Sequence, residues 1–171
     1  MSVCIFFIYS ASDSYQAKYL PLCTKYMPGY PITHIGFSIS YARQFLKVPG
    51  VSFNMLQKIM VGPFGNKFLR DVKQAKRSIF LWTVNDEEWM KWSIRKEVDG
   101  VITDDPKKYL KVCDDYEDEN INYSLKSWGA IIWINILAAM FSLLFRFRYG
   151  FKINVGKVRK SLETSTTRAV V

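Results

Sequence analysis

Three side chains suited to binding chemistry stand at the ends of two apolar runs in the segment 78–106. Trp82 and Asn85 end the first run, and Asp104 ends the second. An amphipathic stretch separates the runs, so the pattern predicts a strand, a helix and a second strand parallel to the first. Because the carboxyl ends of parallel strands meet at one rim, we expect an indole, an amide and a carboxylate at that rim. In the alternative interpretation, Asn85 and Asp104 make only capping or turn hydrogen bonds.

Local signals predict where the neighbouring helices begin. Asn85 is followed three positions later by Glu88, which predicts a capping box at the start of a helix over 86–97. Asp105 before Pro106 predicts a second helix start, with a capping carboxylate and a proline in the first turn.

The residues WTVN at 82–85 and VDGVITDDP at 98–106 resemble the last two βα units of the glycerophosphodiester phosphodiesterase family. The resemblance implies an α/β fold, a partial TIM barrel of about the last four βα units over residues 1–113. It is strongest to the membrane-anchored phosphatidylglycerol phospholipase C type, which also carries an apolar segment after the barrel.

The resemblance also implies chemistry for the complete enzyme. Two histidines are expected to act as acid and base, and carboxylates of early strands to hold a divalent cation, Mg²⁺ or Ca²⁺. The single histidine of this chain, His34, matches neither family motif. We therefore predict no catalytic residue, no metal ligand and no cofactor in this chain, and no activity from it alone. By resemblance Trp82 would wall the headgroup pocket; alternatively, it only fills the barrel core.

The remaining part of the barrel segment alternates predicted strands and helices. Strands are predicted over 3–9 and 32–40, and a helix over 15–27 that Pro21 should break or restart. Residues 51–56 fit a short strand or a helix entry. A full barrel needs about 250 residues, whereas this chain has 171. We expect the other strands to come from a longer gene product. The alternatives are that a second polypeptide supplies them or that the isolated piece folds poorly.

Residues 128–145 are eighteen residues without a charge. As a helix they would reach about 27 Å, close to the thickness of a bilayer core, so we predict a membrane helix. Trp128, Trp133 and Phe145 are the predicted aromatic anchors. A buried core helix is the alternative interpretation. Asn135, near the middle, indicates a helix partner or a shallow insertion.

Charge is concentrated after this helix. The predicted basic tail, 146–171, has seven basic residues and one acidic residue, a net charge of +6 out of +9 for the chain. Its first cations, Arg146 and Arg148, are expected to bind anionic phospholipid headgroups. No motif for reading nucleic acid accompanies them, so nucleic acid is not expected as a partner. The acidic stretch within 114–127 is interpreted as a linker rather than a metal site.

The basic tail also bears on membrane topology. The positive-inside rule places the tail in the cytosol, which with one span would put the domain across the membrane. A tail-anchored or monotopic helix in the cytosolic leaflet instead keeps the domain and the tail on the same side of the membrane. We therefore expect the cytosolic face of the endoplasmic reticulum or of a lipid droplet.

Two functions follow as hypotheses. In the first, the chain is the C-terminal part of a glycerophosphodiester phosphodiesterase-like phospholipase whose substrate is a glycerophospholipid or glycerophosphodiester. In the second, it is a non-catalytic, membrane-associated interaction module.

Overall fold

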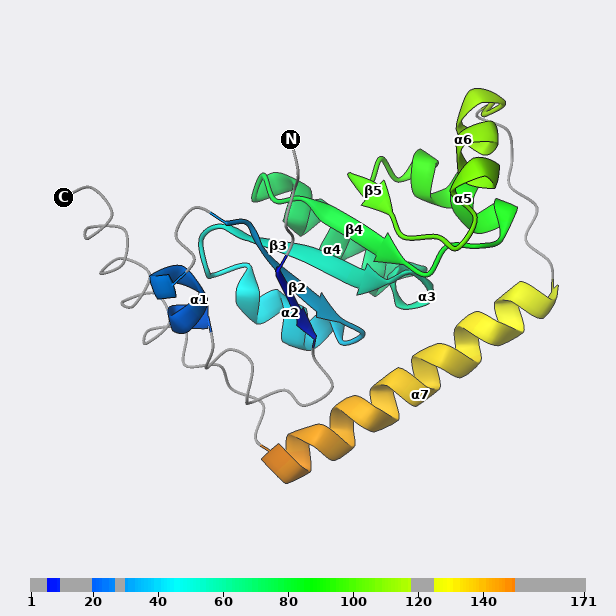
Figure 1. The fold of residues 1–171 in the computed structure, drawn as a ribbon. Helices are drawn as coiled ribbons and strands as arrows, with labels where there is room; N and C mark the ends of the chain where they lie inside the picture. Colours follow the sequence, from blue (N-terminus) through cyan, green and yellow to red (C-terminus); the bar gives the residue numbers. More distant parts are fainter. Residues whose placement is uncertain (1–5, 10–19, 27–29, 118–124, 150–171) are drawn as a thin grey trace.

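The computed structural model describes residues 6–9, 20–26, 30–117 and 125–149, which form a parallel sheet, covering helices and one long helix (Figure 1). The strands are β1 (Phe6–Tyr9), β2 (Ile32–Gly36), β3 (Val51–Leu56), β4 (Ile79–Trp82) and β5 (Gly100–Val101). The helices are α1 (Leu20–Tyr26), α2 (Ile39–Phe45), α3 (Gln57–Met60), α4 (Pro63–Gln74), α5 (Glu87–Arg95), α6 (Pro106–Asp114) and α7 (Leu125–Tyr149).

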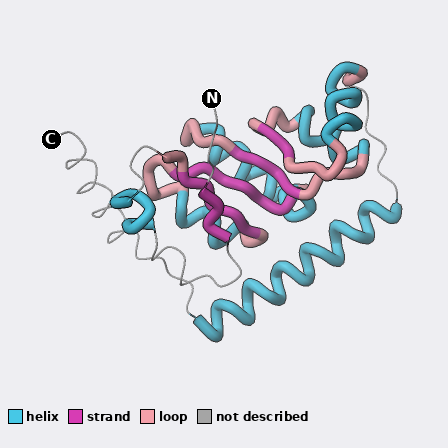
Figure 2. Tube along the Cα trace, in the orientation of Figure 1, coloured by secondary structure: helices cyan, strands magenta, loops and turns pink. Residues whose placement is uncertain are grey.

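The five strands lie in the order in which they occur in the sequence, and every neighbouring pair is parallel. Figure 2 shows them side by side, in magenta, with helices between successive strands. Sequential parallel strands joined by helical crossovers are the arrangement of a TIM barrel, in which eight such strands close the sheet. The α/β class and the partial barrel-like architecture are confirmed, with five strands described where about four units were expected.

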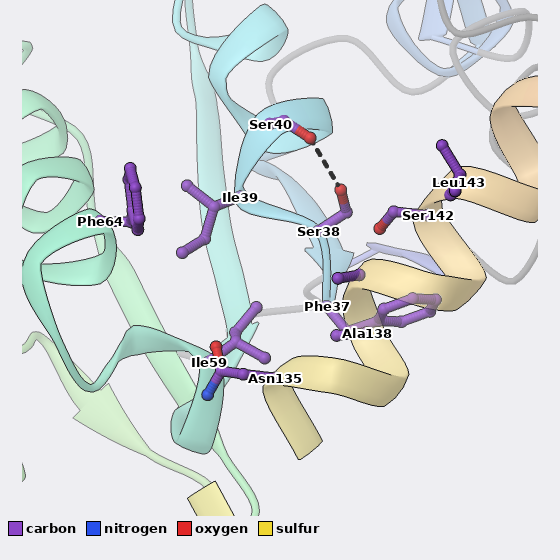
Figure 3. Close-up of a pocket in the computed structure, with 11 residues that line it drawn as sticks. Phe37, Ser38, Ile39, Ser40, Ile59, Phe64, Asn135, Ala138, Ser142 and Leu143 are labelled. Carbon is purple, nitrogen blue, oxygen red and sulfur yellow. Dashed lines mark hydrogen bonds between the residues drawn. The ribbon is translucent and has the colours of Figure 1, made fainter. Parts of the chain in front are cut away.

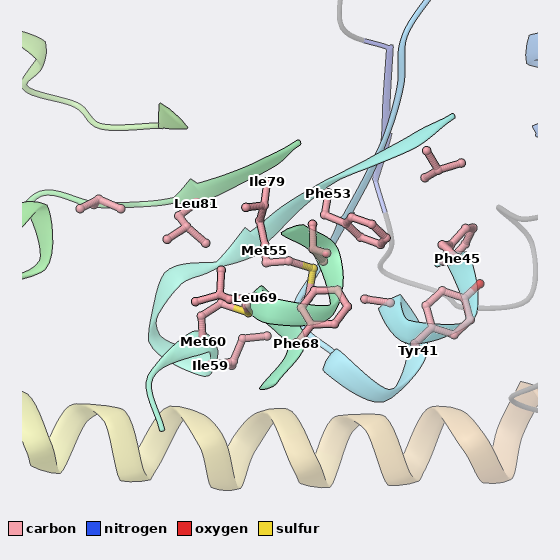
Figure 4. Packing of buried hydrophobic residues seen from close by; sticks show 14 of the residues in the cluster. Tyr41, Phe45, Phe53, Met55, Ile59, Met60, Phe68, Leu69, Ile79 and Leu81 are labelled. Carbon is pink, nitrogen blue, oxygen red and sulfur yellow. The ribbon is translucent and has the colours of Figure 1, made fainter. Parts of the chain in front are cut away.

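The core lies between the sheet and the helices that cover it (Figure 4). Alternate residues of the central strands point to this side, among them Phe53 on β3 and Ile79 and Leu81 on β4. Phe68 and Leu69 of α4 pack against them, and all five side chains are buried. Each such burial contributes about 1.5–3 kcal/mol, so this layer holds the strand ends in place.

One boundary near the N-terminus was predicted wrongly. β2 ends at Gly36 rather than at residue 40, because the chain turns into α2 and buries Tyr41 and Phe45 there. A side chain at position 36 would also lie too close to the imidazole of His34, with a Cβ 2.8 Å from Nε2. For the helix predicted over 15–27, the described part is α1, and Pro21 is its second residue, where a proline is tolerated. This position agrees with a helix that restarts at Pro21.

The predicted starts of the two later helices had different outcomes. Asn85 does not cap α5, so the capping box is wrong: the N-cap position is Asp86, and it makes no side-chain capping bond. For α6 the prediction is confirmed, because the Asp105 side chain accepts a hydrogen bond from the backbone N–H of Lys108 and Pro106 follows in the first turn. Residues 51–56 are a strand, β3.

α7 is longer than the predicted helix over 128–145, since it spans Leu125–Tyr149. Among the described residues it is the one helix long and apolar enough to cross a membrane; its most apolar window, Ser127–Leu144, has a mean hydropathy of 1.8. Only 6% of that window is buried, which argues against the buried core helix. Residues 118–124 of the predicted linker and 150–171 of the predicted tail lie outside the described residues.

Candidate functional site

The rim formed by the carboxyl ends of β4 and β5 carries the three predicted site residues. Strand pairing continues past the strand ends, because Ile102 N–H donates to the Leu81 carbonyl (2.7 Å) and Val84 N–H donates to the Ile102 carbonyl (2.9 Å). This pairing holds the segment after β4 beside the segment after β5. Asn85 and Asp104 are therefore brought together.

Asn85 uses its whole side-chain amide to join the two segments. Its Nδ2 donates to Oδ2 of Asp104 at 2.6 Å. Its Oδ1 accepts from the Asp104 backbone N–H (3.0 Å) and from the Thr103 hydroxyl (3.1 Å). The residues are polar and largely exposed, and their hydrogen bonds fix the shape of the rim. This arrangement fits the alternative interpretation, in which Asn85 and Asp104 make turn hydrogen bonds, with the difference that the bonds cross between two strands.

A basic helix face adjoins this corner. Lys108 of α6 donates from Nζ to the Asn85 carbonyl at 3.2 Å. The pKa of Glu87 is lowered, first by its hydrogen bond from Lys91 and by the charge of that ammonium, and further by the charges of Lys108 and Lys111. The corner thus holds charges of both signs, because these lysines lie among the carboxylates of Glu87, Asp104 and Asp105.

Trp82 ends β4 on the face of the sheet opposite Ile79 and Leu81. It is half-buried, and its Nε1 donates to the Asn54 carbonyl on β3 at 3.3 Å. The Trp82–Thr83 peptide bond is cis. Because of its bond to Asn54, the indole lies across β3 and β4, on the face that would line a barrel interior and outside the helix-covered core.

Buried polar residues on β3 and at the start of α3 were missed by sequence reasoning. Asn54 is 2% exposed and Gln57 is 1% exposed. The Asn54 Oδ1 and both polar atoms of the Gln57 side chain have no hydrogen-bond partner within the described part of the chain. An unpaired buried amide is costly, and such groups concentrate where a ligand or water completes them. The signal was an asparagine inside the apolar run of β3.

His34 lies on the other side of the sheet, in the core. Its ring stacks on Phe45, with centroids 4.5 Å apart, and lies near the rings of Tyr41 and Phe53. Burial lowers the pKa of His34 to about 3, so the imidazole is neutral at physiological pH. Its position among aromatic rings, away from the strand-end rim, fits a packing role.

The rim residues do not fit a divalent cation. Hard cations such as Mg²⁺ and Ca²⁺ take about six or more oxygen ligands, whereas Asp104 Oδ2 is already engaged by Asn85. Across the described ranges, no group of three or more His, Cys, Asp or Glu side chains is placed to hold a metal ion. No metal-dependent step can be assigned to these residues.

A pocket lies beside the carboxyl ends of β2 and β3, where α7 passes the domain (Figure 3). Its volume is about 390 Å³. Its polar lining includes Ser38 and Ser40, whose hydroxyls lie 3.3 Å apart, and Asn135 and Ser142 of α7. Apolar side chains complete it: Phe37, Ile39, Ile59, Phe64 and Leu143. The pocket is mixed in character and shared between the domain and α7.

A scan against protein-family models matches residues 11–108 to the glycerophosphoryl diester phosphodiesterase family. The chain belongs to this family. The matched residues include strands β2 to β5, the helices between them and the rim residues Trp82, Asn85 and Asp104, whereas β1 precedes the matched region. α7 follows the matched region. No curated protein matches the chain.

The residues of this chain that were predicted to anchor it in a membrane all belong to α7. Trp128 is 44% exposed and Trp133 is 62% exposed. The side chains of Phe145, Arg146 and Arg148 lie outside the described residues, although their backbone belongs to α7.

Proposed function

We propose that this chain supplies the C-terminal half of a lipid-directed glycerophosphoryl diester phosphodiesterase. The family match over residues 11–108 carries the proposal. The five-stranded parallel sheet, open at β1 and β5 among the described strands, supports it, because three further strands would close a barrel. The complete enzyme would hydrolyse a phosphoric diester bond of a glycerophospholipid or a glycerophosphodiester.

In this proposal the two halves of the barrel have different roles. The catalytic histidines and the carboxylates for Mg²⁺ or Ca²⁺ belong to the other strands. This half contributes the rim, where Trp82 walls the headgroup pocket and the bonded pair Asn85 and Asp104 shapes its edge. Lys108, whose ammonium adjoins the rim at the Asn85 carbonyl, is the cation proposed to contact the phosphodiester.

The apolar helix and the basic tail support a lipid as the substrate class. We propose a phospholipase of the phosphatidylglycerol phospholipase C type, because an apolar helix and a basic tail follow the domain. Such a tail favours anionic headgroups by about 1 kcal/mol per cation near the surface. The proposed location is the cytosolic face of the endoplasmic reticulum or of a lipid droplet.

Joining the missing strands to this chain tests the proposal. The segment that carries the family's histidine and carboxylate motifs, taken from the adjoining genomic sequence, would be placed before residue 1. The joined protein is expected to release glycerol phosphate or diacylglycerol in a metal-dependent reaction, and Trp82→Ala is expected to raise KM. Phe80→Ala on the same strand is the matched control.

A folded joined protein without turnover on glycerophosphodiesters and phospholipids would favour the other function, a non-catalytic membrane-associated module. In that case the vesicle binding of the chain would persist without hydrolysis.

A further inference from the structure

One face of α7 is attached to the domain along much of the helix. Near its start, the Ser127 hydroxyl donates to Oε1 of Glu88. One turn later Ile131 is 4% exposed, and after another turn Asn135 Nδ2 donates to the Lys58 carbonyl at 3.3 Å. Further along, Ser142 lines the pocket that α7 shares with the domain. The spacing of these residues is that of a single helical stripe.

This stripe crosses the carboxyl ends of three successive strands. Glu88 lies in the first turn of α5, after β4; Lys58 lies in α3, directly after β3; and Ser38 of the pocket follows β2. Figure 1 shows α7 running past the tips of the strand arrows. In TIM barrels these strand ends surround the active site, so α7 lies at the functional rim.

The opposite face of α7 is large, apolar and uncovered in the described part of the chain. Its exposed side chains include Ile132, Trp133, Ile136, Met140, Leu144 and Phe147. α7 contains no acidic residue, and the seven cations of residues 146–171 begin in its last turn. Apolar surface next to a basic cluster complements an anionic bilayer, which has a negative surface and an apolar interior.

The length of the part of α7 that contacts the domain determines how the helix can be oriented in the bilayer. Ser127 to Ser142 corresponds to about 22 Å of helix, and a hydrocarbon core is about 30 Å thick. If α7 crossed the bilayer as attached, the domain beside it would enter the hydrocarbon with charged residues such as Glu88 and Lys58. Charged side chains are strongly disfavoured there.

A helix that lies in the membrane surface ordinarily needs a polar face toward water. α7 lacks one, but the domain covers its Ser127–Ser142 stripe and takes the place of that face. We infer that α7 lies in the plane of an anionic bilayer surface, with its stripe on the domain and its apolar face in the lipid. The strand-end rim and the pocket of Ser38 and Ser142 then face the membrane, and the domain and the basic tail share one side. The inference goes beyond the proposed phosphodiesterase function and does not require it.

Label depth in vesicles tests the orientation. Cys4, Cys23 and Cys113 are replaced by serine in the full chain, and single cysteines at 132, 136, 140 and 147 on the apolar face carry a nitroxide. Position 138, on the pocket side, is the control. The vesicles are phosphatidylcholine with one quarter phosphatidylglycerol, and depth is read from oxygen and nickel-chelate accessibility.

An in-plane helix predicts that all four apolar-face labels lie at similar depths, about 5–10 Å into the membrane, while position 138 is shielded from both reagents. A helix that crosses the bilayer predicts instead a label at 136 near the centre, about 15 Å deep, with 147 near the headgroups. That gradient would overturn the inference.

A second variant keeps the test decisive if labelling perturbs the fold. Ile136→Asp should reduce vesicle binding at least tenfold with an unchanged circular dichroism spectrum, whereas Gln74→Asp, at the exposed end of α4, should leave binding unchanged. Equal binding of both variants, or a chain that buries α7 in a homodimer and ignores vesicles, would also overturn the inference.

Discussion

Asn85 Nδ2 and Asp104 Oδ2 are 2.6 Å apart, and this hydrogen bond joins the segments that follow β4 and β5. The sequence had predicted that Asn85 caps the helix that follows it. The Asn85 side chain instead bonds to Asp104, about 19 residues later in the chain. The pair therefore acts as a tertiary cross-link at the rim.

Replacing Asn85 with alanine should therefore destabilise the domain. The variant loses the bond to Asp104 and the two bonds accepted by Oδ1, and because the site is exposed we expect a loss of about 1–2 kcal/mol in the free energy of unfolding. Urea unfolding measures it. Asp86→Ala is the control, since the Asp86 side chain makes no capping bond; an equal effect of both substitutions would contradict the cross-link.

Asp105 should behave as a helix cap. Asp105→Ala removes the acceptor for the Lys108 backbone N–H and should cost about 1 kcal/mol of stability. Asp105→Asn keeps an acceptor and should cost much less. Equal losses for the two variants in urea unfolding would point to the charge rather than to the cap.

His34 should make stability depend on pH. Its pKa is about 3 in the folded protein because of burial, against 6.5 in a model peptide. Between these values the unfolded chain binds more protons, so stability falls as pH decreases from about 6.5 toward 3 and is unaffected by this group above that range. At pH 5 the loss attributable to His34 is about 2 kcal/mol.

The variant His34→Leu isolates this effect. The difference in unfolding free energy between pH 8 and pH 5 should be smaller in the variant than in the unchanged protein by about 2 kcal/mol. Urea unfolding at several pH values measures it, and identical pH profiles for the two proteins would show that His34 is not the buried neutral group.

The first cations of the basic tail should control binding to charged membranes. Reversing both Arg146 and Arg148 to glutamate should weaken partitioning onto vesicles with phosphatidylglycerol at least tenfold, since each cation near the surface contributes about 1 kcal/mol. Binding to pure phosphatidylcholine vesicles should change little. Unchanged partitioning onto the anionic vesicles would refute the headgroup role.

Elements with strong local signals were predictable from sequence. The Asp105 and Pro106 signal predicted the start of α6, because a cap and a first-turn proline act through neighbouring residues only. The existence of β4 was predicted, but it ends at Trp82 rather than at Asn85, where the apolar run ends. α2 was missed because the apolar pattern continues from Ile35 through Phe37 and Ile39, where strand and helix periods are hard to distinguish.

The relationships that define the site were not predictable in the same way. An asparagine that bonds across strands and one that caps a helix give the same local pattern, and only the pairing of β4 with β5 distinguishes them. The attachment of α7 through Asn135 to Lys58 spans 77 residues of sequence. Asn135 had indicated a partner, but its identity depends on the fold.

The most direct test of the central claim is an assay of the purified chain alone. If the chain is the C-terminal half of a phosphodiesterase barrel, and the catalytic histidines and metal ligands belong to other strands, it should release no glycerol phosphate or diacylglycerol in the presence of Mg²⁺ or Ca²⁺. Measurable release that a chelator abolishes would contradict the account.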